Sequence, residues 1–393
     1  MESTATPDEF AALEKLSLAE LEGIRLVLRG GSVIDWHRLN FRSTSEIDRF
    51  LRAHELDMAD GVDQARAEAV KHAAINYLRR KFDFPVPGRV AELSVRELLQ
   101  LASGKGHKQL CACAILKVMH IIHHLEAREL LFMLPTSDEE LFHLVEQKVY
   151  RVIGGALRRG FPIVEFIGGR KNRDSLYTKL LSKQEVSAAQ IYDKLRFRIV
   201  TRELDDVFPV LNYLTRDVFP FNYAIPREST NTLIPFKRYC ESRPDLATHL
   251  PGLQFSPNLE GDSGLVDNEF SSRSYRVCHF VADMPVRLPE RLLSEAPPAA
   301  WPLGRIVFVQ TEFQILDHAT DRANEHGDAS HSAYKERQQE AVMRRLKVGM
   351  VGTRDAPGPG HRMEVAPPSW GALPLEDDSE PSLPAFPFEE DPS

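Results

Sequence analysis

The hydrophobic period of the chain changes near Pro135, and this change most limits the folds that the sequence can adopt. Before it, apolar residues recur at helical spacing, and pairs of Ser and Glu three residues apart have the pattern of helix-starting capping boxes. These pairs are Ser17/Glu20, Ser43/Glu46 and Ser94/Glu97. After it, short runs typical of strands alternate with helical segments. We therefore expect an α+β chain, with a helical N-terminal domain over 1–135 and a mixed-sheet domain with flanking helices over 136–350.

The second domain can be divided into elements from its local pattern. Strands are expected over 161–167, 191–201, 273–282 and 305–316, and helices over 137–159, 204–214 and 318–346. Gly168-Gly169 predicts a tight turn that ends the first strand. Residues 228–270 lack clear periodicity and are expected to form an insertion, partly disordered. The tail over 351–393 has nine prolines and nine acidic residues, a composition typical of disorder.

Charge is distributed unevenly along a chain whose formal net charge is −8. Residues 151–202 hold twelve Lys and Arg against four Asp and Glu, which indicates a local site for anions such as phosphates. The overall acidity argues against a protein that coats nucleic acid without specificity. Four cysteines, no uninterrupted apolar run near 18 residues and no signal-like N-terminus lead us to expect a cytoplasmic protein without a membrane anchor.

Basic and hydroxyl side chains lie close together directly after Gly168-Gly169. Lys171, Ser175 and Lys179 recur every four residues, so on a helix they share one face, with Arg170 just before it. Two ammonium groups near a helix N-terminus could hold a polyphosphate. A solvated basic face would give the same pattern.

Two carboxylates stand on separate expected strands, Asp193 at the head of one and Glu312 within another. Such a pair suits Mg²⁺, which prefers oxygen ligands and leaves room for substrate phosphates. Gln314 shares the sheet face of Glu312 by strict alternation. Tyr275 and His279, four apart on a third expected strand, could stack on a base and bind a phosphate or ribose. Taken singly, each pattern also fits an ordinary solvent face or cross-strand packing.

The order and spacing of these residues resemble the synthetase domain of the RelA/SpoT family over about 210 residues, from 137 to 346. Glu312-Phe-Gln-Ile-Leu through Tyr334-Lys-Glu336 is similar, without a gap over 23 residues from Gln314, to the family's E-x-Q-I-R-T and A-E-x-G-x-A-A-H-W-x-Y-K-E. His331 falls on the histidine of that motif. Lys171, Ser175 and Lys179 resemble R-x-K-x-x-x-S-x-x-x-K, with Arg170 shifted by one position. The segment 193–198 resembles D-x-x-G-[IV]-R, and 275–279 resembles part of N-G-Y-x-S-x-H.

The resemblance implies an alarmone synthetase, which transfers pyrophosphate from ATP to the 3′-hydroxyl of GDP or GTP. It implies that Asp193 and Glu312 hold Mg²⁺ and are the catalytic residues. It further implies two sets of binding residues. Those for ATP are Arg170, Lys171, Ser175, Lys179 and Arg198; those for the acceptor are Tyr275, His279, Gln314 and His331.

Departures from the family pattern leave two other functions open. Arg196 stands at the family's glycine, Leu316 at the arginine of Q-I-R-T, and Ser274 at the glycine before the tyrosine. These changes favour a catalytically altered nucleotide-binding module with a regulatory role. The insertion beside the acceptor site favours a toxin-like enzyme that modifies tRNA. The sequence also leaves open whether the chain forms a homo-oligomer.

The family's long members carry an upstream hydrolase with an H…HD…ED metal site, and residues 1–135 do not show that pattern. His120, His123 and His124 are close in sequence to His107 and two cysteines, which could suggest a metal site. Histidines in and beside a core helix explain the same spacing more simply.

Overall fold

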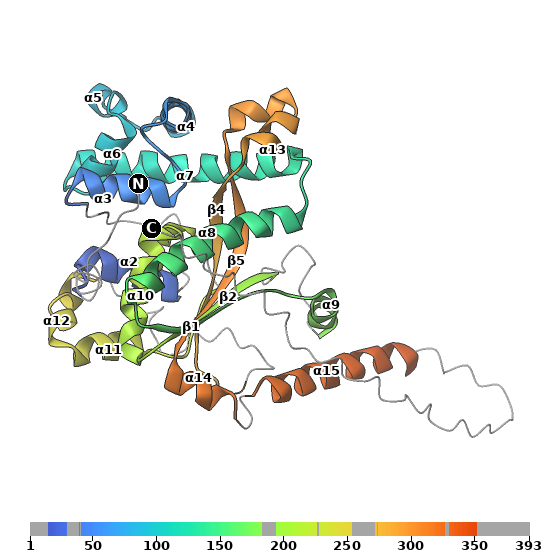
Figure 1. Cartoon of the computed structure of the whole chain (residues 1–393). Helices are drawn as coiled ribbons and strands as arrows, with labels where there is room; N and C mark the ends of the chain where they lie inside the picture. Colours follow the sequence, from blue (N-terminus) through green and yellow to red (C-terminus); the bar gives the residue numbers. More distant parts are fainter. Residues whose placement is uncertain are drawn as a thin grey trace, which may run out of the picture.

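The computed structural model describes residues 15–29, 39, 41–182, 194–225, 228–253, 272, 274–326 and 330–351, without the side chains of residues 331 and 348–351. In this part of the chain the fold is α+β with a mixed sheet, as expected. Figure 1 shows helices α3 to α7 on one side of the molecule and the sheet extending away from them. The expected boundaries at 135 and 350 and the disorder of 351–393 stay predictions.

Helices occupy the described chain before the first strand. They are α2 (Leu18–Arg29), α3 (Thr44–Ala53), α4 (Gly61–Phe82), α5 (Gly88–Ala91), α6 (Val95–Ala102), α7 (His107–Met133) and α8 (Asp138–Arg158). Their starts agree with the local sequence signals. Ser94 and Glu97 form a full capping box at α6, and Ser137 accepts the amide of Glu140 at the start of α8. Side-chain oxygens at these positions satisfy backbone donors that a helix leaves unpaired.

Helix α7 is long and apolar enough to cross a membrane by length and composition, with a mean hydropathy of 1.4 over its most apolar window. In the structure it packs against α4 and α6, and Cys111, Ile115 and Leu116 are among its buried residues. A core helix passes the same test of length and composition. The expectation of no membrane contact stays a prediction.

The sheet has the strand order β1-β2-β5-β4-β3. Its strands are β1 (Ile163–Arg170), β2 (Leu195–Thr201), β3 (Thr230–Asn231), β4 (Cys278–Arg287) and β5 (Ile306–Asp317). Only β2 and β5 run parallel; the other neighbouring pairs are antiparallel. The longest strand, β5, therefore has one parallel and one antiparallel neighbour, which brings residues from two distant segments, β2 and β4, beside it.

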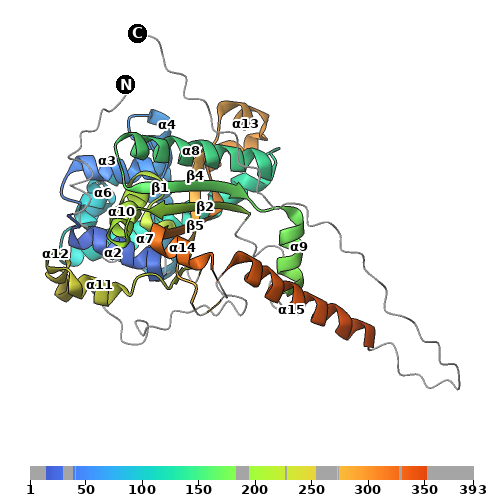
Figure 2. The same cartoon turned by 60° about the horizontal axis from the view of Figure 1, so that its bottom comes forward.

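The remaining described helices connect and flank the strands. They are α9 (Arg173–Ser182), η2 (Leu204–Asp206), α10 (Val207–Asp217), η3 (Phe221–Tyr223), α11 (Phe236–Ser242), α12 (Pro244–Ala247), η4 (Leu250–Gly252), α13 (Glu290–Glu295), η5 (Pro298–Leu303), α14 (His318–Asn324) and α15 (His331–Val351). Figures 1 and 2 agree that α9 and α15 lie side by side and project from the rest of the molecule. Arg345 of α15 donates to the carbonyl of Leu181 at 2.8 Å, which joins the two helices.

The largest apolar core combines the sheet with α8, α10 and α2. Leu21, Ile24 and Val27 of α2 are fully buried in the same cluster as Phe280 and Phe313 of the sheet. A second core lies among α3, α4, α6 and α7. The N-terminal residues are thus divided between two cores, although their sequence pattern is helical throughout.

The predicted turn at Gly168-Gly169 is wrong. Strand β1 continues through both glycines, which pair with Phe197 and Arg196 of β2. A Cβ atom on Gly168 would lie 2.4 Å from the hydroxyl of Tyr150 and 2.9 Å from the ring of Phe197. This glycine therefore allows a close approach of α8 to the sheet rather than a change of chain direction.

The predicted helix over 318–346 is divided into α14 and α15. Asp317 caps α14 by accepting the amides of Ala319 and Thr320. At the other end of α14, the buried side chain of Asn324 bonds to the backbone of Arg276. Its Nδ2 donates to the carbonyl at 2.7 Å, and its Oδ1 accepts the backbone N–H at 3.1 Å. These bonds fasten the end of α14 to the segment that leads into β4.

The first part of the predicted insertion is folded. Residues 228–253 form β3, α11, α12 and η4, and Ile234, Cys240 and Leu246 are buried in the large core. The elements are too short for their periodicity to be visible in the sequence. Residues 254–271 lie outside the described part of the chain.

Candidate active site

The centre of the candidate site is a polar patch on one face of β5. Glu312 and Gln314 share that face, as alternation predicts, while Phe313 points into the core on the other side. In the register of the sheet, Glu312 lies opposite Arg196 of β2, and Gln314 lies between Arg198 of β2 and His279 of β4. The topology thus brings together residues that are up to 118 positions apart in the sequence.

Glu312 is 5% exposed and is held by two neighbours. Gln314 Nε2 donates to Glu312 Oε1 at 2.7 Å, and His279 Nε2 lies 3.1 Å from the same oxygen. Burial alone would raise the pKa of this carboxyl, but His279, Arg196 and the bond from Gln314 outweigh it and hold the pKa well below its usual 4.5. The site therefore keeps an ionised carboxylate away from bulk water.

The low pKa of Glu312 predicts a loss of stability in acid. Because the folded chain holds this proton less tightly than the unfolded chain, the stabilisation is present above about pH 4.5 and is lost as the pH falls below that value. We expect the free energy of unfolding of the wild type, relative to Glu312→Gln, to decrease between about pH 6 and about pH 3. Urea unfolding across this range measures it. A difference between the two proteins that stays constant would contradict the assigned environment of the carboxyl.

Tyr275 lies next to this patch but not on the strand that was predicted for it. Strand β4 begins at Cys278, so the expected strand over 273–282 starts too early. The carbonyls of Tyr275 and Val277 instead accept bonds from Thr232, at 3.1 Å to its hydroxyl and 3.0 Å to its amide. Burial raises the pKa of the Tyr275 phenol, and the charges of Arg198, Glu312 and Arg196 all act on it. The phenol is thus within electrostatic range of the patch around Glu312.

The two arginines that the resemblance places on ATP have carboxylate partners. Arg198 pairs with Asp321 of α14. Arg170 forms a two-pronged pair with Glu146 of α8, at 2.8 Å and 2.6 Å, and Glu146 is 5% exposed. The Glu146 bond raises the pKa of Arg170. Arg198 remains beside Gln314, whereas Arg170 is directed to α8 and away from β5.

A test of Arg170 separates its structural role from a role in binding ATP. Arg170→Met would leave Glu146 buried without its strongest partner, and we expect a loss of about 1–3 kcal/mol in the free energy of unfolding with little change in the KM for ATP. Arg173→Met, which removes an exposed arginine in the first turn of α9, is the matched control and should change neither quantity. A higher KM with unchanged stability would instead assign Arg170 to the nucleotide.

Of the predicted phosphate-binding residues, Ser175 and Lys179 are on α9, whereas Lys171 lies between β1 and α9, so the three do not share one helix as expected. Lys171, Ser175 and Lys179 are half-buried, and the amide of Lys171 donates to the carbonyl of Lys194 at 3.0 Å. Helix α9 therefore starts near the end of β2 that holds Arg196, the residue paired with Glu312 of β5. Asn172 caps the helix by accepting the amide of Ser175 at 2.7 Å, so this amide is not available to a phosphate.

Two predicted site residues cannot be placed. Asp193 lies outside the described residues, and His331 begins α15 with its side chain outside the description. Among the described residues, no group of three or more His, Cys, Asp or Glu side chains could hold a metal ion, and this applies to the histidines of α7 as well. One ionised carboxylate, that of Glu312, has the hard oxygen chemistry that Mg²⁺ requires, and substrate phosphates commonly complete such a site.

Sequence reasoning missed the partners of the arginines, Glu146 and Asp321. Glu146 follows the buried Val145 in α8, and an acid on the apolar face of a helix is a signal for a buried ion pair. Asp321 gave no such signal, because it lies in a polar helix and meets Arg198 only through the parallel pairing of β2 and β5.

No family model and no curated protein matches the sequence. Solved structures of small alarmone synthetases 2 and 1 from Bacillus subtilis are similar, with 17% and 15% identity, coverage of 55% of this chain and of 96% and 93% of theirs, and a TM-score of 0.28 each. Small alarmone synthetase 1 bound to its product pppGpp is similar at 16% identity over 55% of this chain and 90% of that one, with a TM-score of 0.30. Likeness at this level assigns no function by itself.

Proposed function

We propose that the chain is a RelA/SpoT-type pyrophosphotransferase, which moves the β,γ-diphosphate of ATP to the 3′-hydroxyl of a guanine nucleotide. The observation that carries the proposal is the polar patch on β5. Glu312, Gln314 and His279 converge there from two strands, with Arg196 and Arg198 on a third. The motif resemblance assigns Glu312, Gln314, His279 and Arg198 to one site, and their proximity supports that assignment, although Arg196 and Leu316 depart from the motif.

The proposed roles follow from the chemistry of each group. Lys179 of α9 and Lys171, just before that helix, neutralise the phosphates of ATP, and Arg198 lies against the adenine. Tyr275 stacks on the acceptor base, and His279, Gln314 and His331 contact the acceptor. Glu312 is buried and ionised, so it can act as an anionic ligand and take the proton that the hydroxyl loses as its oxygen bonds to phosphorus. Asp193 joins Glu312 in holding Mg²⁺, which would neutralise charge on the transferred phosphates.

The reaction conserves atoms without a covalent enzyme intermediate. The 3′-oxygen of the acceptor forms a bond to the β-phosphorus of ATP, and the bond between the α,β-bridging oxygen and that phosphorus breaks. AMP leaves with the bridging oxygen, and the proton of the hydroxyl passes to Glu312. The contribution of the protein is to align the two nucleotides and to offset the charge that develops.

A second function, a nucleotide-binding module without turnover, is favoured by the ion pairs of the site. Arg170 and Arg198 are paired with Glu146 and Asp321, and the guanidinium of Arg196 adds a positive charge beside Glu312 where the motif has glycine. Such a module would bind ATP or a guanine nucleotide and respond to it through its helices.

Label transfer decides between the two functions. The purified protein is incubated with γ-³²P-ATP, Mg²⁺ and, in separate reactions, GDP, GTP, AMP, ADP or total tRNA, and the products are separated. Transfer to GDP or GTP that requires Mg²⁺ and is lost in Asp193→Ala supports the synthetase. Label on tRNA would replace it with a tRNA-modifying enzyme. Binding of ATP without transfer to any acceptor would establish the nucleotide-binding module.

A further inference from the structure

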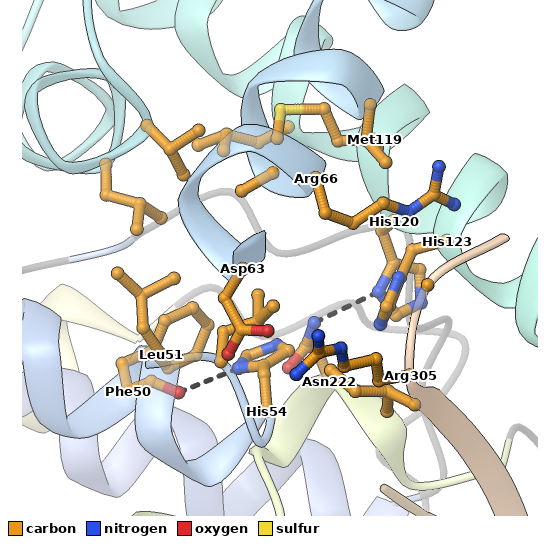
Figure 3. A pocket seen from close by; sticks show the side chains of 18 of the residues that line it. Phe50, Leu51, His54, Asp63, Arg66, Met119, His120, His123, Asn222 and Arg305 are labelled. Carbon is orange, nitrogen blue, oxygen red and sulfur yellow. Dashed lines mark hydrogen bonds between the residues drawn. The ribbon is translucent and has the colours of Figure 1, made fainter. Parts of the chain in front are cut away.

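A cavity lies where the N-terminal helices meet the start of β5. Its volume is ≈ 100 Å³, and it is bounded by α3, α4, α6 and α7 on one side and by η3, η5 and Ile306 on the other (Figure 3). Most of its wall is apolar. The apolar lining includes Leu51, Val70, Leu99, Leu116 and Met119.

Buried polar atoms without a hydrogen-bond partner occur in this wall. Oδ1 of Asn222 and Nε2 of His123 are among them. Asn222 is 3% exposed, and its Nδ2 lies 3.2 Å from Nδ1 of His120, the contact drawn as a dashed line in Figure 3. An amide nitrogen can only donate, so in this contact Nδ1 of His120 accepts, and Oδ1 of Asn222 is left as an acceptor. A buried acceptor without a donor loses its hydration with no compensation, so the site is poised for a group that donates.

The charged side chains at the cavity already have partners. The pairs are Asp63–Arg287, Arg66–Glu126 and Arg305–Glu290. The histidines add no charge at neutral pH, since burial lowers the pKa of His54 to about 4 and of His123 to about 3. An ionic ligand would find no free counter-charge among these groups and would lose its hydration, whereas a neutral ligand avoids that penalty.

We propose that this cavity binds a small uncharged molecule of about the size of one aromatic ring, whose hydroxyl or N–H donates to Oδ1 of Asn222. The cavity is smaller than an engineered apolar cavity of about 150 Å³ that holds benzene, but it is not closed, so a ring can enter with its polar edge first and remain partly outside. A single water could meet the acceptor but would leave the apolar wall without contacts. This ligand is distinct from the nucleotides of the proposed reaction.

The position of the cavity gives such a ligand a structural effect. Ile306 lines it, and Glu312 is six residues further along the same strand, about 20 Å away at strand geometry. The ligand would contact the N-terminal helices and β5 together. It would therefore stabilise the junction between them. Because it binds only the folded protein, it would also raise the free energy of unfolding.

Phenol and anisole test the proposal, because anisole has the same ring but no donor. Binding to the full chain is measured by calorimetry and by the shift in unfolding temperature. We expect saturable binding of phenol and at least about ten-fold weaker binding of anisole, the ratio that one hydrogen bond of about 1.4 kcal/mol supplies. No saturable phenol binding, as for a cavity that holds only water, would overturn the proposal, and so would equal binding of the two ligands.

Variants place the binding in this cavity. Ala67 is buried and lines it, so Ala67→Leu should fill the space and abolish phenol binding. Asn222→Leu should remove the preference for phenol over anisole. Asn212→Leu, the same change at a buried asparagine of α10 outside the cavity, is the matched control and should leave the preference intact. Persistence of binding in folded Ala67→Leu protein would overturn the assignment. Neither outcome depends on catalytic activity, so the proposed function can fail separately.

Discussion

Glu312→Gln is expected to lower the rate of label transfer by about 10²–10³-fold while the protein stays folded. Glutamine has nearly the same shape, and its Oε1 can still accept the bond from Gln314. It carries no charge, so it can neither take the proton of the acceptor hydroxyl nor serve as an anionic metal ligand. The measurement is the rate of ³²P transfer from ATP at saturating acceptor. Thermal unfolding of the wild type and of Glu312→Gln shows whether the variant is folded.

Glu340→Gln provides the matched control for this prediction. Glu340 is exposed on α15 and pairs only loosely with Arg344 at 3.7 Å, so the same chemical change should leave transfer unchanged. If Glu312→Gln retained most of the transfer activity, the carboxylate would have no essential part in the reaction. In that case the polar patch on β5 would have to be reinterpreted as a binding surface.

Phe313→Ala is expected to reduce the free energy of unfolding by about 3–5 kcal/mol. The Phe313 ring is fully buried and lies 5.4 Å from Phe280, 5.3 Å from Phe219 and 5.7 Å from Phe197. Truncation removes buried apolar surface and leaves a cavity. The surrounding side chains are held in the sheet and cannot move in to close it. Because Phe313 adjoins Glu312 on β5, activity should fall together with the folded fraction.

Phe132→Ala is the comparison for the stability effect. Phe132 is 77% exposed at the end of α7, and its contact with Arg128 is open to solvent, so we expect a change below about 1 kcal/mol. Chemical unfolding of both variants separates the two values clearly. A small loss for Phe313→Ala would mean that the aromatic cluster is not the centre of the core.

The local sequence pattern was sufficient to predict those features of the fold that depend on residues close in sequence. The cap at Ser137 predicted the start of α8, and alternation predicted that Glu312 and Gln314 share a face while Phe313 is buried. These properties follow from backbone period and side-chain hydrogen bonds over three or four residues. They do not require knowledge of the strand order.

Tertiary contacts decided the features that the sequence did not predict. Gly168 continues β1 because Tyr150 packs against its backbone, which no local rule for glycine pairs includes. The ion pair of Arg170 depends on where α8 crosses the sheet. Tyr275 reaches the site through a segment bonded to Thr232, so a period-2 pattern gave it the wrong element.

Burial of α2 against the sheet affects any attempt to isolate the second domain. A fragment beginning at residue 136 would lack Leu21, Ile24 and Val27, and their partners in α10 and the sheet would face water. Uncovered apolar surface of this kind promotes aggregation. Production of the second domain alone therefore calls for α2 to be supplied, either by fusion to the fragment or as a separate peptide.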